Sequence, residues 1–365
     1  MKNSTISLDR RLIIIILSSA SVFVLCTIIM GIWAFQKFKA LEEENTTLNE
    51  TRLILISKLK ENNSEILSLK KLLQSKTDTV VKFEKPKPAE NYNFSGSDEF
   101  IKKVNGIPVS ISNGPVDRKI VCLTFDGGSL ANAVDDILDT LRSREIKATM
   151  FVTGRFVQKF PEEIKRILAE GHELGNHTYS HPHLTTYEQN RKQITLPEVT
   201  PKLLNDELSK ADKILFDISN HHFAPLWRAP YGELNPLICS WALNAGYIHV
   251  GWRQGRGWSQ NLDSNDWIVE ESSPGYKSPQ DVLMKILAIA DTKPYGINGG
   301  IILMHLGTLR TQKEKQVHKI LGTIIDSLDS RGYTFVTASE MVKSSGISLP
   351  SSQEVKLVSI NPESR

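Results

Sequence analysis

Cysteine is scarce in this chain, because its 365 residues include only Cys26, Cys122 and Cys239. So few thiols exclude a disulfide-stapled scaffold and a four-cysteine zinc site, and any metal must rely largely on His, Asp or Glu. A large excess of one charge is missing too, since 44 Lys and Arg face 41 Asp and Glu. A dedicated nucleic-acid binder would show a concentrated basic excess, so we expect no nucleic-acid partner. With 40% hydrophobic residues, the composition also excludes wholesale disorder.

One long uncharged run lies near the N-terminus, from Leu12 to Phe35. At 1.5 Å per residue, a helix of this length spans about 36 Å, which exceeds the ~30 Å hydrocarbon core of a bilayer. Secretory signals have apolar cores of only about 7–15 residues, so we interpret 12–35 as an uncleaved signal anchor rather than a cleaved signal peptide. Arg10 and Arg11 favour a cytoplasmic tail at 1–11 and an extracytoplasmic remainder.

The segment 38–75 carries a heptad pattern in which eight of eleven seam positions, from Phe38 to Leu73, are apolar. This pattern fits a coiled-coil stalk that forms a homodimer beside the membrane, and it fits a single amphipathic spacer helix equally well. A linker containing proline and lysine follows over 76–97. We expect the main domain at 98–345 and a flexible tail at 346–365.

Short β-rich runs alternate with helical segments in the main domain, which predicts an α/β fold with parallel strands joined by helices. The expected strands are 120–125, 148–152, 171–175, 246–252, 300–304 and 334–336, and the expected helices include 131–143 and 161–170. In barrels built this way, active residues gather at the C-terminal ends of the strands. The polar residues at those ends are therefore the candidates for chemistry.

Two of these candidates suit metal or acid–base chemistry. Asp126 follows an apolar strand and precedes two glycines, so it fits a general base, a metal ligand or a turn former. His177 and His181 are four residues apart, and on a helical turn both imidazoles would face one divalent metal. A pair of surface histidines is the alternative for that segment. His172, on the strand side, is more consistent with a structural role.

Three further candidates keep both a functional and a structural interpretation. Arg228 lies in Arg-Ala-Pro-Tyr-Gly, and its planar fork fits a clamp on a carboxylate or a structural ion pair. The segment 263–267 offers two carboxylates beside the Trp267 indole, which fits a pocket wall or a solvated loop. His305 ends an apolar run, and it fits a general acid or a structural histidine.

Taken in order, these motifs resemble the five motifs of the NodB-homology polysaccharide deacetylases, carbohydrate esterase family 4. They are Thr-Phe-Asp-Gly-Gly at 124–128, His-x-x-x-His-Pro at 177–182, Arg-x-Pro-Tyr at 228–231, Asp-x-x-Asp-Trp at 263–267 and Leu-x-His at 303–305. The resemblance covers about 119–341 and implies a distorted (β/α) barrel.

The resemblance also implies roles for particular residues. Asp126 would be the catalytic base, and His177 with His181 would bind a divalent metal, usually zinc, which polarises the acetamido carbonyl and activates water. His305, oriented by Asp266, would protonate the leaving amine.

Four more positions take roles from the same resemblance. Arg228 would pair with a catalytic carboxylate, and the backbone N–H of Tyr231 would stabilise the oxyanion. Trp267 and Leu303 would form the walls that hold the acetyl group.

One position departs from the family pattern. The first motif of the family reads Thr-Phe-Asp-Asp-Gly, and its second Asp, the third metal ligand, is here Gly127. Extra residues at 253–262 and a long stretch at 183–226 are expected to reshape the groove. We expect a membrane-anchored deacetylase of an N-acetylated cell-envelope polysaccharide such as peptidoglycan. The alternatives are a catalytically silent glycan-binding module, which Gly127 favours, and a deacylase of a small amide or ester.

Overall fold

The computed structural model describes residues 37, 39, 100–104, 106–255 and 257–350. The expected cytoplasmic tail, membrane anchor and linker lie outside these residues, and so does the stalk apart from Lys37 beside it and Lys39 within it. Among the described residues, no helix combines the length and the apolar character needed to cross a bilayer. These N-terminal expectations therefore stay predictions.

The described chain forms one nine-stranded sheet. Its strands are β1 (Ile101–Val104), β2 (Ile107–Ile111), β3 (Ile120–Gly127), β4 (Thr149–Val152), β5 (Glu173–Asn176), β6 (Leu226–Trp227), β7 (Ile248–Val250), β8 (Gly300–His305) and β9 (Thr334–Phe335). The spatial order is β1-β2-β7-β6-β5-β4-β3-β8, and β9 pairs with β3. The pair β1 and β2 is antiparallel, whereas the other pairs are parallel.

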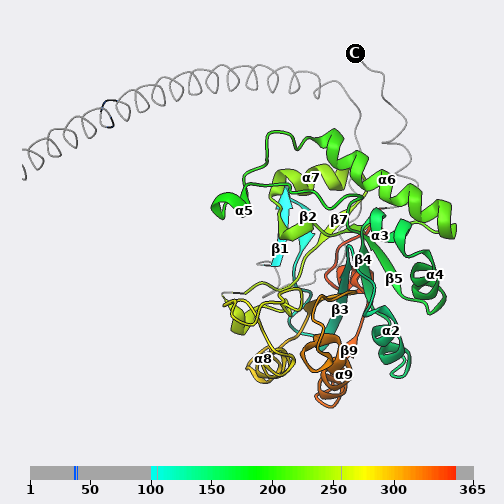
Figure 1. The fold of residues 1–365 in the computed structure, drawn as a ribbon, viewed down its shortest axis with the longest axis vertical. Coiled ribbons are helices and arrows are strands. Elements are labelled where there is room, and N and C mark those ends of the chain that lie inside the picture. The colour runs from blue at the N-terminus through cyan, green and yellow to red at the C-terminus, as the bar shows by residue number, and fades with distance from the viewer. Residues whose placement is uncertain (1–36, 38, 40–99, 105, 256, 351–365) are drawn as a thin grey trace, which may run out of the picture. The chain divides into compact units, whose positions relative to one another are not determined.

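Helices connect the strands and cover the outside of the sheet (Figure 1). They are α2 (Val134–Arg142), α3 (Gly154–Lys159), α4 (Pro161–Ala169), α5 (Tyr187–Asn190), α6 (Pro201–Ser219), α7 (Pro236–Asn244), α8 (Pro279–Asp291), α9 (Leu321–Asp329) and α10 (Ala338–Ser344), with 3₁₀ turns η2 (Pro230–Gly232), η3 (Trp258–Gln260), η4 (Lys313–Lys315) and η5 (Val317–Ile320). Several begin with a capping side chain or a proline in the first turn, as sequence signals for helix starts require.

Strand β3 shows how the sequence builds two apolar layers. Its side chains alternate between the faces of the sheet. Val121, Leu123 and Phe125 pack in the outer layer with the buried face of α2. Cys122 points to the inner side, where it joins a second cluster that includes Phe151 of β4 and residues of α10. Because both faces are covered, the strand is apolar almost throughout, as parallel strands are.

Irregular chain, rather than a strand pair, joins the two ends of the sheet. Gly114, just after β2, donates its N–H to the Gly299 carbonyl at 2.7 Å, just before β8. Along the other edge of β8, Ser264 donates to the Leu303 carbonyl at 3.0 Å, and Leu303 donates to the Leu262 carbonyl at 2.9 Å. The expected barrel is therefore present, and its distortion lies at this join.

The sequence predicted the type and order of the central elements correctly. The expected strand 120–125 continues to Gly127, and the expected strand 246–252 shortens to β7. The expected helix 131–143 begins later, at Val134, because Ala131 to Ala133 form a turn held by the Leu306 carbonyl.

Replacing Leu138 with Ala should test the outer layer. Leu138 is wholly buried on α2, so its removal should lower the free energy of unfolding by about 2–5 kcal/mol through lost burial and a cavity. Denaturant unfolding of the full chain measures this change. The matched control is Leu237→Ala on α7, where the side chain is 52% exposed, and it should change stability by less than about 0.5 kcal/mol. Equal losses in both variants would contradict the described packing.

Candidate active site

Four of the predicted site residues meet at the C-terminal ends of neighbouring strands. Asp126 lies near the end of β3, His177 follows β5, Arg228 follows β6 and His305 ends β8. Asp126 and His305 are direct neighbours in the parallel register of β3 and β8. Parallel strands bring their carboxyl ends to one edge of the sheet, so residues far apart in sequence share one site.

The centre of this site is a buried ion pair between Asp126 and Arg228. Arg228 Nη1 donates to Asp126 Oδ1 at 2.7 Å, and the Arg228 side chain is fully buried. The guanidinium also donates to the Val250 and Gly251 carbonyls, and it lies 4.2 Å from the centre of the Phe151 ring. These contacts satisfy the charge in several directions, as a buried ion pair requires.

Arg228 decides the protonation state of Asp126. Burial alone would favour the neutral acid, but Arg228, with help from His177 and His305, holds the pKa of Asp126 below its usual range. Asp126 is therefore a carboxylate at neutral pH, able to accept a proton.

His177 is oriented by its backbone partner. Its Nδ1 donates to the Arg228 carbonyl at 2.9 Å, because a carbonyl can only accept. In the neutral ring the lone pair is therefore on Nε2, which lies 3.6 Å from Asp126 Oδ2. Burial lowers the pKa of His177, so the neutral imidazole is the form present at neutral pH.

The expectation of a helical turn for the histidine pair was wrong. The chain after β5 is an irregular loop in which Thr178 and His181 have left-handed φ values of 64° and 62°. The loop is held by Glu207 of α6, whose carboxylate accepts the N–H groups of Tyr179 and Ser180. The two imidazoles still meet, with ring centres 4.7 Å apart. Burial and the neighbouring His177 lower the pKa of His181 to about 3.

His305 and Asp266 form a second charged pair. His305 Nδ1 lies 2.6 Å from Asp266 Oδ1, and the His305 backbone N–H donates to Asp266 Oδ2 at 2.9 Å. Burial opposes the charged ring, but the Asp266 carboxylate prevails and raises the pKa of His305 to about 9. At neutral pH the His305 ring is therefore protonated on both nitrogens and positively charged, whereas Asp126 is a carboxylate.

The remaining predicted residues lie around these pairs. Tyr231 has a left-handed φ of 57° in η2, and its 54% exposed side chain contacts His181 edge-on at 4.4 Å. Trp267 follows Asp266 directly and is 57% exposed. Leu303 is buried on β8, two residues before His305, and so shares its face of the strand.

Two imidazoles of the site could bind a metal ion. His177 and His181 are neutral imidazoles close to each other. The bond from His177 Nδ1 to the Arg228 carbonyl leaves Nε2 free to bind an ion, as in many metal-binding histidines. The residues therefore fit an ion held by two imidazoles. Within 100–104, 106–255 and 257–350, however, no group of three or more His, Cys, Asp or Glu side chains forms a metal cluster.

Gly127 stands where the family motif has its third metal ligand, and it offers no side chain to a metal. Strand β3 remains regular through Gly127, whose carbonyl accepts the Thr153 N–H at 2.9 Å. Strand alternation then places position 127 on the face opposite Asp126. A Cβ there would lie 3.0 Å from Leu306 and Val152 and 3.2 Å from Phe156, all in the apolar outer layer.

Sequence reasoning missed one support of the site, the pair His183 and Glu233. Glu233 is buried, and it accepts hydrogen bonds from the backbone of Leu184 and Thr185 while contacting His183 Nδ1 at 2.9 Å. The His183 ring stacks on Tyr231 with centres 4.1 Å apart. The position of His183, two residues after His181, was the available signal. His172 is structural as expected, since its Nδ1 accepts the Ala148 N–H.

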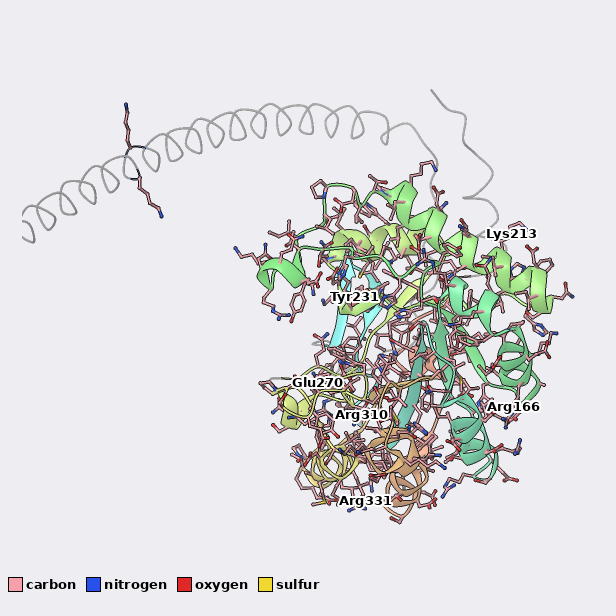
Figure 2. The ribbon with its side chains drawn as sticks, in the orientation of Figure 1. Arg166, Lys213, Tyr231, Glu270, Arg310 and Arg331 are labelled. Carbon is pink, nitrogen blue, oxygen red and sulfur yellow. The ribbon has the colours of Figure 1, made fainter. Side chains whose placement is uncertain are left out.

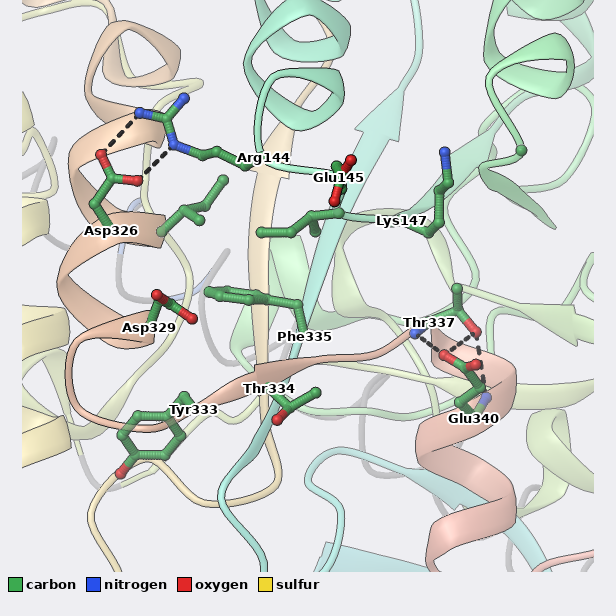
Figure 3. A pocket seen from close by; sticks show the side chains of 13 residues that line it. Arg144, Glu145, Lys147, Asp326, Asp329, Tyr333, Thr334, Phe335, Thr337 and Glu340 are labelled. Carbon is green, nitrogen blue, oxygen red and sulfur yellow. Dashed lines mark hydrogen bonds and ion pairs between the residues drawn. The ribbon is translucent and has the colours of Figure 1, made fainter.

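A surface hollow of about 730 Å³ lies elsewhere, lined by residues such as Arg144, Lys147 and Tyr333 (Figure 3). Lys147 precedes β4 and Thr334 begins β9, so the hollow lies toward the N-terminal ends of these strands. Its polar groups are used structurally: Arg144 pairs with Asp326, and Glu340 caps α10. It takes no part in the site of Asp126.

The fold and the site define a (β/α) barrel in which a buried carboxylate and a protonated histidine lie on adjacent strand ends. The polysaccharide deacetylase family model matches residues 113–250. A peptidoglycan-N-acetylglucosamine deacetylase of Bacillus cereus is 33% identical over 229 residues, which cover 63% of this chain and 91% of that protein. The chain belongs to the NodB-homology polysaccharide deacetylases, carbohydrate esterase family 4.

Other relatives share part of their length with this chain. The peptidoglycan-N-acetylglucosamine deacetylase PgdA of Listeria monocytogenes is 32% identical over 66% of this chain, which spans about two-fifths (41%) of that protein. The solved Bc1960 peptidoglycan N-acetylglucosamine deacetylase has a TM-score of 0.51 at 27% identity, over 67% of this chain and 95% of that one. A family 4 pseudoenzyme of Bacillus anthracis, with a TM-score of 0.50 at 23% identity over 64% and 68% of the chains, shares the fold alone.

Asp266→Asn should lower the pKa of His305. The wild-type value of about 9 depends on the Asp266 carboxylate, so its loss should bring the pKa to the ordinary ~6.5 or below. NMR titration of the histidine ring measures it, with Asp212→Asn, which removes the partner of surface His222, as the control. By the same linkage, the pair stabilises the wild type fully below about pH 6.5, and that contribution disappears as the pH rises through about 9. An unchanged His305 pKa in Asp266→Asn would contradict this origin.

Proposed function

We propose that this chain removes N-acetyl groups from a cell-envelope polysaccharide. The observation that carries the proposal is the pairing of opposite protonation states at one strand edge. Asp126 is held as a carboxylate by Arg228, and His305 is held protonated by Asp266, on adjacent strands. Two titratable groups pushed apart in this way match a general base and a general acid.

The base and the acid account for both proton transfers of amide hydrolysis. Asp126 accepts a proton from the attacking water while the water oxygen forms a bond to the acetyl carbon. His305 then donates its proton to the sugar nitrogen as the carbon–nitrogen bond breaks, which releases acetate and a free amine. Asp266 keeps the His305 ring in place, because its carboxylate contacts both the ring Nδ1 and the backbone N–H of His305.

The substrate groups would be held by the residues around the two pairs. The Tyr231 N–H is the proposed donor to the oxyanion, in a backbone turned by its left-handed φ. Trp267 and Leu303 are the proposed walls for the acetyl group. Trp267 is half exposed, which suits a polymer that enters from solvent.

His177 and His181 are the proposed ligands of a divalent metal, for which zinc is the natural candidate with imidazole donors. When bound, such an ion polarises the acetamido carbonyl and lowers the pKa of water. With two imidazoles in place of three protein ligands, binding should be weaker than in a catalytic zinc site of the usual kind.

Peptidoglycan is the proposed polymer, because the relatives from Bacillus cereus and Listeria monocytogenes carry that substrate in their names. The apolar run 12–35 supports a single-pass membrane anchor with the domain outside the cytoplasm. The heptad pattern of 38–75 supports a short stalk that keeps the domain near the wall and through which two chains would form a homodimer.

Acetate release from N-acetylglucosamine oligomers tests the activity. The full chain with added zinc should release acetate, and Asp126→Ala should lower kcat by about 10²-fold or more because the base is lost. The control Asp326→Ala alters the ion pair in the hollow and should leave the rate unchanged.

The alternatives give different results in the same assay. If the chain binds glycans but releases no acetate from several polymers with any divalent metal, the proposed deacetylase activity is refuted. That result would support the catalytically silent glycan-binding module that Gly127 favours. Faster hydrolysis of N-acetylglucosamine monomer or of a small ester than of oligomers would instead support a small-molecule deacylase.

Zinc binding should depend on the two imidazoles. His181→Ala should weaken zinc binding about tenfold or more, since it removes one of two donors. Isothermal titration of metal-free protein measures the affinity without reference to activity. The control is His222→Ala, a surface histidine that pairs with Asp212, and it should bind as the wild type does. Equal affinity of wild type and His181→Ala would refute this ligand assignment.

A further inference from the structure

Arg310 is a buried arginine that lies outside the five family motifs (Figure 2). It lies five residues after His305, and only 4% of it is exposed. Its guanidinium donates four hydrogen bonds to backbone carbonyls. The acceptors are Ile268 from Nε at 2.9 Å, Lys277 and Lys315 from Nη1 at 2.9 Å each, and Asn265 from Nη2 at 3.1 Å.

Two of these carbonyls flank the pair Asp266 and Trp267. Asn265 precedes the pair and Ile268 follows it, so one side chain grips the loop on both sides of the residues that face the site. Asn265 has a left-handed φ of 52°, a conformation that costs energy and persists only where surrounding contacts impose it. The Arg310 bond to the Asn265 carbonyl is one such contact.

The chemistry of this contact requires arginine. Four acceptors around one planar group match the fixed fork of guanidinium donors, which an ammonium does not reproduce. The guanidinium lies 4.4 Å from the centre of the Tyr276 ring. The backbone of Arg310 is held as well, because the Gln316 side chain donates to its carbonyl. The buried charge also lies near enough to Asp266 to interact with its carboxylate.

We propose that Arg310 is a positioning residue that fixes the Asn265–Ile268 loop, so that Asp266 holds His305 as the proton donor. This role rests on the proposed deacetylase function, in which His305 protonates the leaving amine. Arg310 acts on the reaction only through Asp266, and it touches no reacting atom.

The experiment uses the full chain with Arg310→Lys, and Arg310→Gln as a second variant should the first fail to fold. On N-acetylglucosamine oligomers, kcat should fall about tenfold to hundredfold with little change in KM, because proton donation weakens while substrate contacts remain. In the Asp266→Asn background the same change should cost nothing further, since the two residues act in series. Arg331→Lys is the matched control, an arginine whose partner is the surface residue Asp291.

A spectroscopic readout tests the proposal independently of turnover. The proton on His305 Nδ1, identified by its absence in His305→Gln, should move or vanish from the NMR spectrum of folded Arg310→Lys and stay in place in Arg331→Lys. An unchanged signal, or a full additional loss of kcat in the Asp266→Asn background, would overturn the role of Arg310. An inactive wild type with the expected spectral change would refute the deacetylase function and leave the positioning role standing.

Discussion

A carboxylate and a guanidinium are buried together at the mouth of the barrel, and the surrounding strands are arranged to make that possible. Arg228 reaches Asp126 from the end of β6 and donates to the carbonyls of Val250, which ends β7, and of Gly251. Its own carbonyl accepts a hydrogen bond from His177 Nδ1. Loss of one partner would leave the other charge buried and unpaired, which typically costs 3–5 kcal/mol. The same pair therefore links the stability of the strand ends to the protonation state of the proposed base.

The site takes its second half from strand register. Asp126 and His305 are adjacent because β3 and β8 pair in parallel over six residues. A slip of one residue would turn every side chain of the slipped strand to the opposite face of the sheet. The apolar residues that alternate with them, among them Phe125 and Met304, are buried in the outer layer and oppose such a slip. The geometry of the candidate site and the packing of the core therefore both follow from the alternation of side chains along β3 and β8.

Much of this could be predicted from the sequence, for identifiable reasons. The runs around Val121 and Ile302 are apolar enough to be buried strands, and the polar residues that end them had to lie at one edge of a parallel sheet. The backbone between His177 and His181 could not be predicted, because its left-handed residues are not glycines and depend on Glu207 from a distant helix.

Arg310 escaped prediction for a related reason. Its four partners are backbone carbonyls, which leave no trace in the types of the residues that supply them. The role of a side chain that binds only backbone carbonyls can be identified only once the course of the backbone is known. Loops placed by such long-range contacts are therefore where reasoning from local pattern ends.

Gly127 separates two contributions that the family resemblance treats as one. The protonation states of Asp126 and His305 are set by Arg228 and Asp266, and neither partner depends on residue 127. The proposed acid and base roles therefore do not require a carboxylate at position 127. What that absence would weaken is the affinity of the proposed ion site at His177 and His181, because Gly127 has no carboxylate to offer. Of the proposed chemistry, carbonyl polarisation by a bound ion is therefore the part for which this chain offers the fewest side chains.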